Sequence, residues 1–194
     1  MNPRFTFIAA PLLMLAYGLI RILDGLDGVY GPGLAWTAGH LAFMGGLVFF
    51  VVIFRDLYRR LGRAWPATIS VILGLAGIAC LFAQFGIDIV IGFMAADRDA
   101  MGTMFDQVQA LPAVRLAVYD VGPFLFYVAQ FALVVHLAVR GQVKAWMPVM
   151  MLAGLVLPVI DKDLIPVSAI VLVGVFWSMS RGTSPAAPRA LART

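Results

Sequence analysis

Six long apolar runs, separated by short polar or glycine-rich loops, set the pattern of the chain. A helix needs about 20 consecutive apolar residues to cross a bilayer. The runs are continuously apolar rather than alternating, which favours helices over the strands of a membrane barrel. The fourth run has two candidate starts, residues 113 and 118, because charged side chains interrupt it there. We therefore predict an all-α, polytopic membrane bundle with six transmembrane helices, at residues 5–23, 34–54, 67–95, 113–139, 145–160 and 164–179.

The composition supports this class and excludes a soluble one. Hydrophobic residues make up 62% of the chain and charged residues 12%, whereas soluble domains carry about 25% charged residues. The longest connection, between the third and fourth runs, has room for a short interfacial helix. We expect a single transmembrane domain at residues 1–180. A disordered cytoplasmic tail, rich in Ala, Pro, Ser and Arg, should follow at residues 181–194.

The basic residues predict the orientation, because Lys and Arg of membrane proteins gather in cytoplasmic loops. If the N-terminus is cytoplasmic, ten of the fourteen basic residues fall on that side: Arg4, Arg55, Arg59, Arg60, Arg63, Arg140, Lys144, Arg181, Arg189 and Arg193. The bias holds at every loop, so both termini are predicted to be cytoplasmic, in a bacterial plasma membrane. The same loops account for the net charge of +4, and we expect no nucleic-acid partner.

One carboxylate, Asp88, lies within the third apolar run, and Gln84 precedes it by one helical turn. A carboxylate that faces lipid is costly, so Asp88 should face protein or a water-filled cavity. His40 lies six residues inside the second run, and Asp88 lies seven residues inside the opposite end of the third. At 1.5 Å per residue, both sit roughly 10 Å below the outer edge of the apolar region. The sequence therefore predicts an imidazole and a carboxylate at one depth.

Other polar residues near the outer ends of the runs extend this group into a predicted outward-facing pocket. Asp120, Tyr127 and Gln130 share one face of the fourth run, at spacings of seven and three residues. Simpler interpretations stay open, namely a local Arg21–Asp24 ion pair, a hydrogen-bonded core histidine, and glutamines that only tie helices together. The predicted ligand-binding residues are Tyr17, Arg21, Asp24, His40, Gln84, Asp88, Asp120, Tyr127, Gln130 and Asp161.

Motifs for cofactor and metal chemistry are missing from the sequence. There is no Walker motif, GxGxxG, GxSxG or HExxH, and Cys80 is the only cysteine. We predict no cofactor and no metal site, and a hard divalent cation held by Asp oxygens stays open. The expected partners are membrane lipid and an unidentified small molecule or ion, and a homo-oligomer stays open.

Three functions remain on this evidence. The first is binding or transport of a small polar solute, proton or cation. The second is an intramembrane enzyme for a lipid or isoprenoid-like substrate, with Asp88, His40 and Asp120 as acid–base residues. The third is a structural or accessory subunit. A transporter needs polar residues that continue toward the cytoplasm, whereas an enzyme needs two groups near one reacting atom in a dead-end pocket.

Overall fold

The computed structural model describes residues 3–26 and 30–181, and every regular element among them is a helix. The predicted tail at residues 182–194 lies outside the described part of the chain. The connection between the third and fourth apolar runs contains a helix, α4 (Arg98–Gln109). The elements are α1 (Pro3–Asp24), α2 (Leu34–Arg60), α3 (Trp65–Met94), α4 (Arg98–Gln109), α5 (Pro112–Val114), the π-helix η1 (Arg115–Val121), α6 (Gly122–Val139), α7 (Trp146–Ile160), the 3₁₀ turn η2 (Lys162–Leu164) and α8 (Ile165–Arg181).

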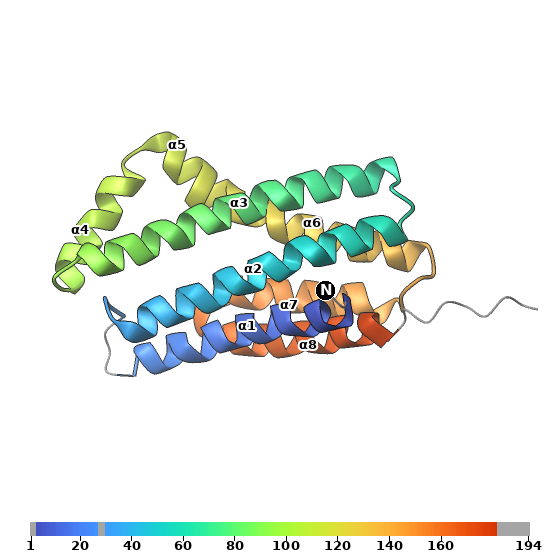
Figure 1. Cartoon of the computed structure of the whole chain (residues 1–194), viewed down its shortest axis with the longest axis horizontal. Helices are drawn as coiled ribbons and strands as arrows, with labels where there is room; N and C mark the ends of the chain where they lie inside the picture. Colours follow the sequence, from blue (N-terminus) through green and yellow to red (C-terminus); the bar gives the residue numbers. More distant parts are fainter. Residues whose placement is uncertain (1–2, 27–29, 182–194) are drawn as a thin grey trace, which may run out of the picture.

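Six helices pack side by side in a closed ring. Going round the ring, α1 contacts α2, α2 contacts α3, α3 contacts α6, α6 contacts α7, α7 contacts α8, and α8 returns to α1. Neighbouring helices run in opposite directions, while α4 and α5 fold back outside the ring at one end (Figure 1). The ring therefore has an interior that all six helices share.

Five of these helical segments are long and apolar enough to cross a membrane: Arg4–Asp24, Leu34–Arg60, Trp65–Met94, Pro112–Val139 and Lys162–Arg181. The remaining predicted span, α7, has only 15 residues. At 1.5 Å per residue it is roughly 22 Å long, which is shorter than the hydrocarbon core of about 30 Å. The structure thus supports five of the six predicted spans by length and composition, and it leaves α7 as a short apolar helix.

Small residues allow the helices to approach one another closely. A Cβ atom on Gly18 of α1 would lie 2.8 Å from Cγ2 of Ile165, at the start of α8. A Cβ on Gly77 of α3 would overlap the backbone nitrogen of Phe126 in α6. Such contacts between small residues and neighbouring backbone are typical of membrane helices, whose association depends on close packing.

Aromatic side chains fill the half of the ring interior that lies toward the end of α2. Phe50 contacts Phe126 and Phe176, with ring centroids 5.0 and 5.6 Å apart, and Phe7 packs on Phe176 at 5.9 Å. These four phenylalanines have no exposed surface. This half of the interior is therefore a solid apolar core.

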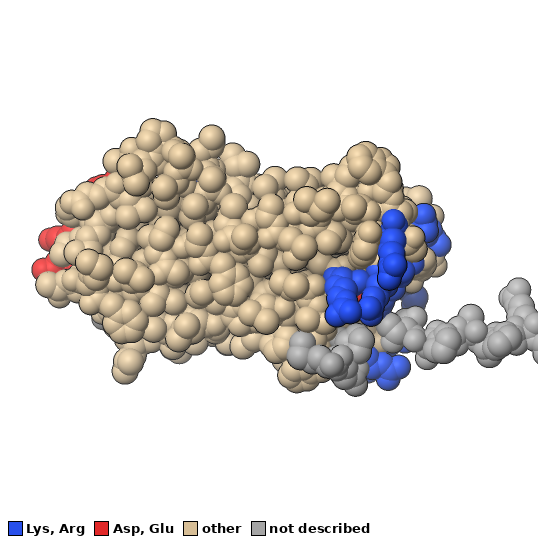
Figure 2. Space-filling view, turned by 45° about the horizontal axis from the view of Figure 1, so that its top comes forward, with Lys and Arg blue, Asp and Glu red and all other residues tan. Residues whose placement is uncertain are grey.

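Arginines close the bundle beyond this aromatic core. Arg60 pairs with Asp56 at 2.6 Å and donates a hydrogen bond to the carbonyl of Met179, at the end of α8. Arg140 donates to the carbonyl of Leu61, just after α2. On the face shown in Figure 2, Lys and Arg gather at this end and acidic residues lie at the opposite end, with an uncharged surface between them. The guanidinium groups thus satisfy carbonyls that helix ends leave free.

Candidate functional site

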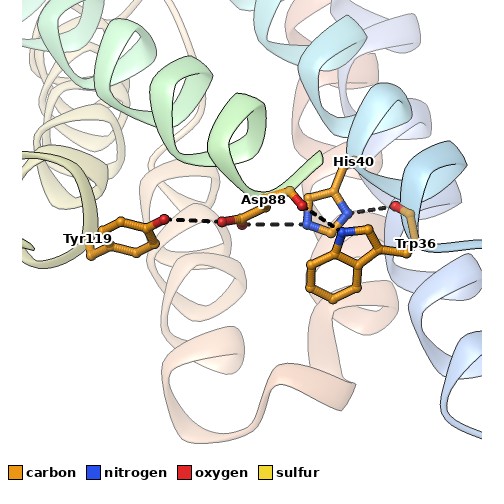
Figure 3. Close-up of polar contacts among 4 residues, drawn as sticks. All are labelled: Trp36, His40, Asp88 and Tyr119. Carbon is orange, nitrogen blue, oxygen red and sulfur yellow. Dashed lines mark hydrogen bonds and ion pairs between the residues drawn. The ribbon is translucent and has the colours of Figure 1, made fainter. Parts of the chain in front are cut away.

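Asp88 of α3 and His40 of α2 face each other inside the ring. Oδ2 of Asp88 lies 3.5 Å from Nε2 of His40. Both residues are buried, with 8% and 5% of their surface exposed. Because α2 and α3 are antiparallel neighbours, residues near the start of one helix meet residues near the end of the other (Figure 3).

The other ring nitrogen of His40 determines where its protons lie. Nδ1 is 2.6 Å from the carbonyl oxygen of Trp36, one helical turn earlier. A carbonyl oxygen only accepts hydrogen bonds, so Nδ1 must carry a proton. Nε2 therefore faces the Asp88 carboxylate either as an N–H donor of an imidazolium or as a bare acceptor. Two acceptors repel each other at this distance, so the stable pair holds one further proton, on Nε2 or on Asp88.

Trp36 also connects α2 to α3, through the backbone of Asp88. Its indole Nε1 donates a hydrogen bond of 2.9 Å to the backbone carbonyl of Asp88. The space for the indole comes from Gly92, since a Cβ atom there would lie 2.7 Å from Cδ1 of Trp36. The pairing of Trp36 with Asp88 depends on helix rotation, which hydropathy does not reveal.

Tyr119 is the second side-chain partner of Asp88, and sequence reasoning missed it. Its hydroxyl donates to Oδ1 of Asp88 over 3.2 Å. In a continuous α-helix, Asp120 would share a face with Tyr127, seven residues later. The π-helix η1 holds one more residue per turn than an α-helix. This shift puts Tyr119 toward α3 and turns Asp120 away, and the irregular start of the fourth apolar run was the only sequence signal of it.

A cavity of about 380 Å³ adjoins this group and is lined by residues from every helix of the ring. Asp24, Tyr30 and Lys162 line it at the connections α1–α2 and α7–α8, so the cavity reaches that end of the bundle. At its inner end it meets the apolar core. Seven of the ten predicted ligand-binding residues line this one cavity: Tyr17, Arg21, Asp24, His40, Gln84, Asp88 and Tyr127.

Three predicted residues are not among those that line the cavity. Asp120 is half exposed and pairs with Arg115 at 3.5 Å, because η1 rotates it outward. Asp161 is exposed and accepts a hydrogen bond from the backbone nitrogen of Asp163, which makes it the cap of η2. Gln130 lies one turn beyond Tyr127 and is 1% exposed within the packed core. Without Asp120, the predicted acid–base set is reduced to Asp88 and His40.

Polar groups at the two ends of the cavity differ in character. At the mouth, Nε of Arg21 lies 3.8 Å from Oδ1 of Asp163, and its guanidinium stacks on the ring of Tyr30 at 4.3 Å. Deeper, Oε1 of Gln84 is a buried acceptor with no hydrogen-bond partner. The mouth thus holds a charge pair, whereas the deeper part offers an acceptor that a ligand can satisfy.

The cavity wall is weakest between α6 and α7. These two helices pack less extensively than any other adjacent pair in the ring. Phe124 of α6 and Val159 of α7 line the cavity, yet 53% and 68% of their surface is exposed. This seam is therefore the side on which the cavity is least closed toward the outer surface of the bundle.

The described residues contain no group of three or more His, Cys, Asp or Glu side chains that would hold a metal ion. The site consists of a buried carboxyl group and a buried imidazole 3.5 Å apart, beside an amphipathic cavity. Such a site can exchange a proton, bind a polar group, or donate and accept protons in a reaction. Neither a family model, nor a curated protein, nor a solved structure matches this chain.

Proposed function

We propose that the chain is an integral protein of a bacterial plasma membrane, with six spanning helices and cytoplasmic termini. The place of α7 in the ring, between α6 and α8, supports a sixth span. Its length of 15 residues is accommodated by local thinning of the bilayer. The arginine-rich end is the cytoplasmic one under the positive-inside rule, and the cavity mouth then lies on the outer side.

We propose that the protein binds a small polar solute in this cavity, with the Asp88–His40 pair as its proton-exchanging binding group. The observation that carries the proposal is the Nδ1 contact of His40 with the Trp36 carbonyl, at 2.6 Å. It leaves Nε2 facing a carboxylate, so the pair needs one proton to be stable. Burying a pair of this kind costs free energy unless the pair is fully hydrogen-bonded. A contact that only held two helices together would not need ionisable groups.

The aromatic core favours a binding pocket over a through-path. Below the cavity, Phe50, Phe126 and Phe176 fill the interior with no exposed surface. Among the described residues, the buried polar side chains outside the cavity lining are Thr6, Gln130 and Ser180. Transport through the protein would require these helices to separate, so the packed core supports a binding site rather than a through-path.

An intramembrane enzyme is the second candidate, and the seam between α6 and α7 favours it. A lipid or isoprenoid-like substrate would pass between Phe124 and Val159 and present its reacting atom to Asp88 and His40. Both catalytic groups would then act from one wall of a dead-end cavity. Chemical conversion of an added lipid, lost in Asp88→Asn, separates this candidate from solute binding.

Thermal unfolding of the detergent-purified chain tests the binding site. A panel of amines, carboxylates, sugars and alcohols should contain compounds that raise the unfolding temperature of the parent. A ligand at a hundred times its Kd stabilises a protein by about 2.7 kcal/mol. Asp88→Asn should abolish that shift, because an uncharged amide cannot hold or exchange the proton that Asp88 shares with His40.

Asp120→Asn is the matched control, since Asp120 is an aspartate of the same chain that points away from the cavity. It should keep the full ligand-dependent shift and insert normally. If Asp88→Asn retained every shift that the parent shows, the cavity would not be a binding site.

A further inference from the structure

We infer that the solute is an organic ammonium cation, which replaces the proton held between His40 and Asp88. This inference rests on the proposed function, because it names the ligand class of the same cavity. It follows from three features of the lining: an acceptor without a partner, aromatic walls and the charge of the pair.

Two acceptor residues lie on one face of α3, and a third acceptor comes from α2. Asp88 and Gln84 are four residues apart, and both line the cavity. Oε1 of Gln84 is buried without a partner. If the pair loses its proton, Nε2 of His40 becomes an acceptor too, since Nδ1 keeps its proton on the Trp36 carbonyl. The cavity then presents three acceptors to the three N–H donors of a primary ammonium group.

The walls around these acceptors are aromatic. Tyr17 packs edge-on against His40, Phe43 and Phe85, with centroids 5.8, 5.2 and 5.5 Å apart. Trp36 lies against the His40 ring at 4.2 Å. Aromatic faces attract organic cations by electrostatics, most strongly where water is excluded. An ammonium ligand with an apolar or aromatic body fits both the walls and a cavity of about 380 Å³.

Charge balance requires that one proton leaves the pair for each ammonium ion that binds. With its proton, the His40–Asp88 pair is neutral, and an added ammonium would leave an uncompensated buried cation. The bond between the shared proton and the pair therefore breaks as the ammonium arrives. The proton leaves through the mouth to solvent, and the ammonium forms hydrogen bonds with the Asp88 carboxylate in its place. The ligand's own N–H bonds stay intact. The pair without its proton carries one negative charge, which the ammonium neutralises, so the site as a whole stays neutral.

Other charged and titratable groups line the cavity without taking over this role. Arg21 is held at the mouth by Asp163, 3.8 Å away. Tyr119 donates to the other carboxylate oxygen, Oδ1, and leaves Oδ2 for the exchange. The remaining members are Tyr17 and Asp24 of α1, Tyr30, Tyr127 of α6 and Lys162 of η2.

Calorimetry with a matched pair of probes tests the inference on the purified full-length chain. The probes are 2-phenylethylammonium and its neutral counterpart 2-phenylethanol, titrated at one pH in buffers with different ionisation enthalpies. The amine should bind with release of about one proton. Its affinity should rise about tenfold per pH unit while the pair still holds its proton, because release of a proton is favoured at low proton concentration. The alcohol should bind at least tenfold more weakly and release none.

Variants separate the roles of the groups. Asp88→Asn should lose both amine binding and proton release, whereas Asp120→Asn should keep both. If the alcohol binds as tightly as the amine, with no proton released, the ammonium inference fails while a solute site remains. If neither probe binds, the ammonium inference is overturned, and the wider thermal screen decides the proposed function by itself.

Discussion

At the scale of single residues, the burial of Asp88 depends on three partners drawn from two elements, α2 and η1. His40 and Tyr119 contact its two carboxylate oxygens, and Trp36 contacts its backbone carbonyl. Burying a carboxylate costs several kcal/mol unless such contacts replace its water. These residues therefore form a network. Removing one partner leaves another polar group buried without a hydrogen bond.

Gly92 and Gly86 offer a direct test of how Trp36 is held. Gly92→Ala should lower the unfolding free energy by about 1–3 kcal/mol, because the added methyl group pushes the indole off the Asp88 carbonyl. Gly86→Ala is the matched control on the same helix, where nothing lies within 4 Å of the added Cβ. It should be neutral, or stabilising by about 0.5–1 kcal/mol. Thermal unfolding of both variants in detergent measures the difference, and equal effects would contradict the bracing role of Trp36.

At the scale of elements, the π-helix η1 decides which residue of the fourth span meets Asp88. A π-helix holds an extra residue per turn, so its neighbours keep their places while the residues inside it rotate. Tyr119 thereby takes the position that an α-helix would give to Asp120. A second acid beside Asp88 would repel it, whereas a tyrosine hydroxyl donates a hydrogen bond to it.

A double-mutant cycle tests this register. Tyr119→Phe in the parent should cost about 1.5–3 kcal/mol, the usual value of a hydrogen bond to a charged group. Deletion of Ala117, which shortens η1 by one residue, should restore α-helical geometry and turn Tyr119 away from Asp88. Tyr119→Phe should then cost almost nothing in the deletion background. An undiminished cost would show that η1 does not position Tyr119, and Ala117→Ser controls for the change at that site.

At the scale of the whole molecule, closure of the ring depends on α7, the shortest of its six helices. It joins α6 and α8, and Oγ of Ser168 in α8 donates a 2.6 Å hydrogen bond to the Gly154 carbonyl in its middle. If α7 crosses the membrane, its two ends face opposite sides. The proposed outward opening of the cavity depends on that arrangement.

Cysteine labelling in intact cells measures this topology. Starting from Cys80→Ser, the chain receives single cysteines at Gly102 in α4, Lys144 before α7 and Lys162 after it, all exposed positions. A membrane-impermeant maleimide should label positions 102 and 162 in intact cells, and position 144 only after permeabilisation. Protection of position 162 together with labelling of position 102 would mean that α7 does not cross.

Much of the architecture follows from the sequence alone. The long uncharged runs determine helices, because a backbone in lipid must satisfy its own hydrogen bonds. The observed helices α2 and α3 begin or end within a few residues of the predicted limits, although α2 continues to Arg60 rather than stopping at residue 54. The depth of His40 and Asp88 also follows, since the rise per residue is constant along a helix. The structure has these two side chains 3.5 Å apart.

Only the tertiary structure decided how each helix is rotated and which helices are neighbours. Those choices depend on close contacts such as Gly77 with Phe126, and on the extra residue in η1. They bring Tyr119 and Trp36 to Asp88 and send Asp120 outward, which no helical period could indicate. Hydropathy measures how much a segment prefers lipid, and so it determines spans and depths. Rotation about the helix axis changes no hydropathy, so packing alone assembled the cavity.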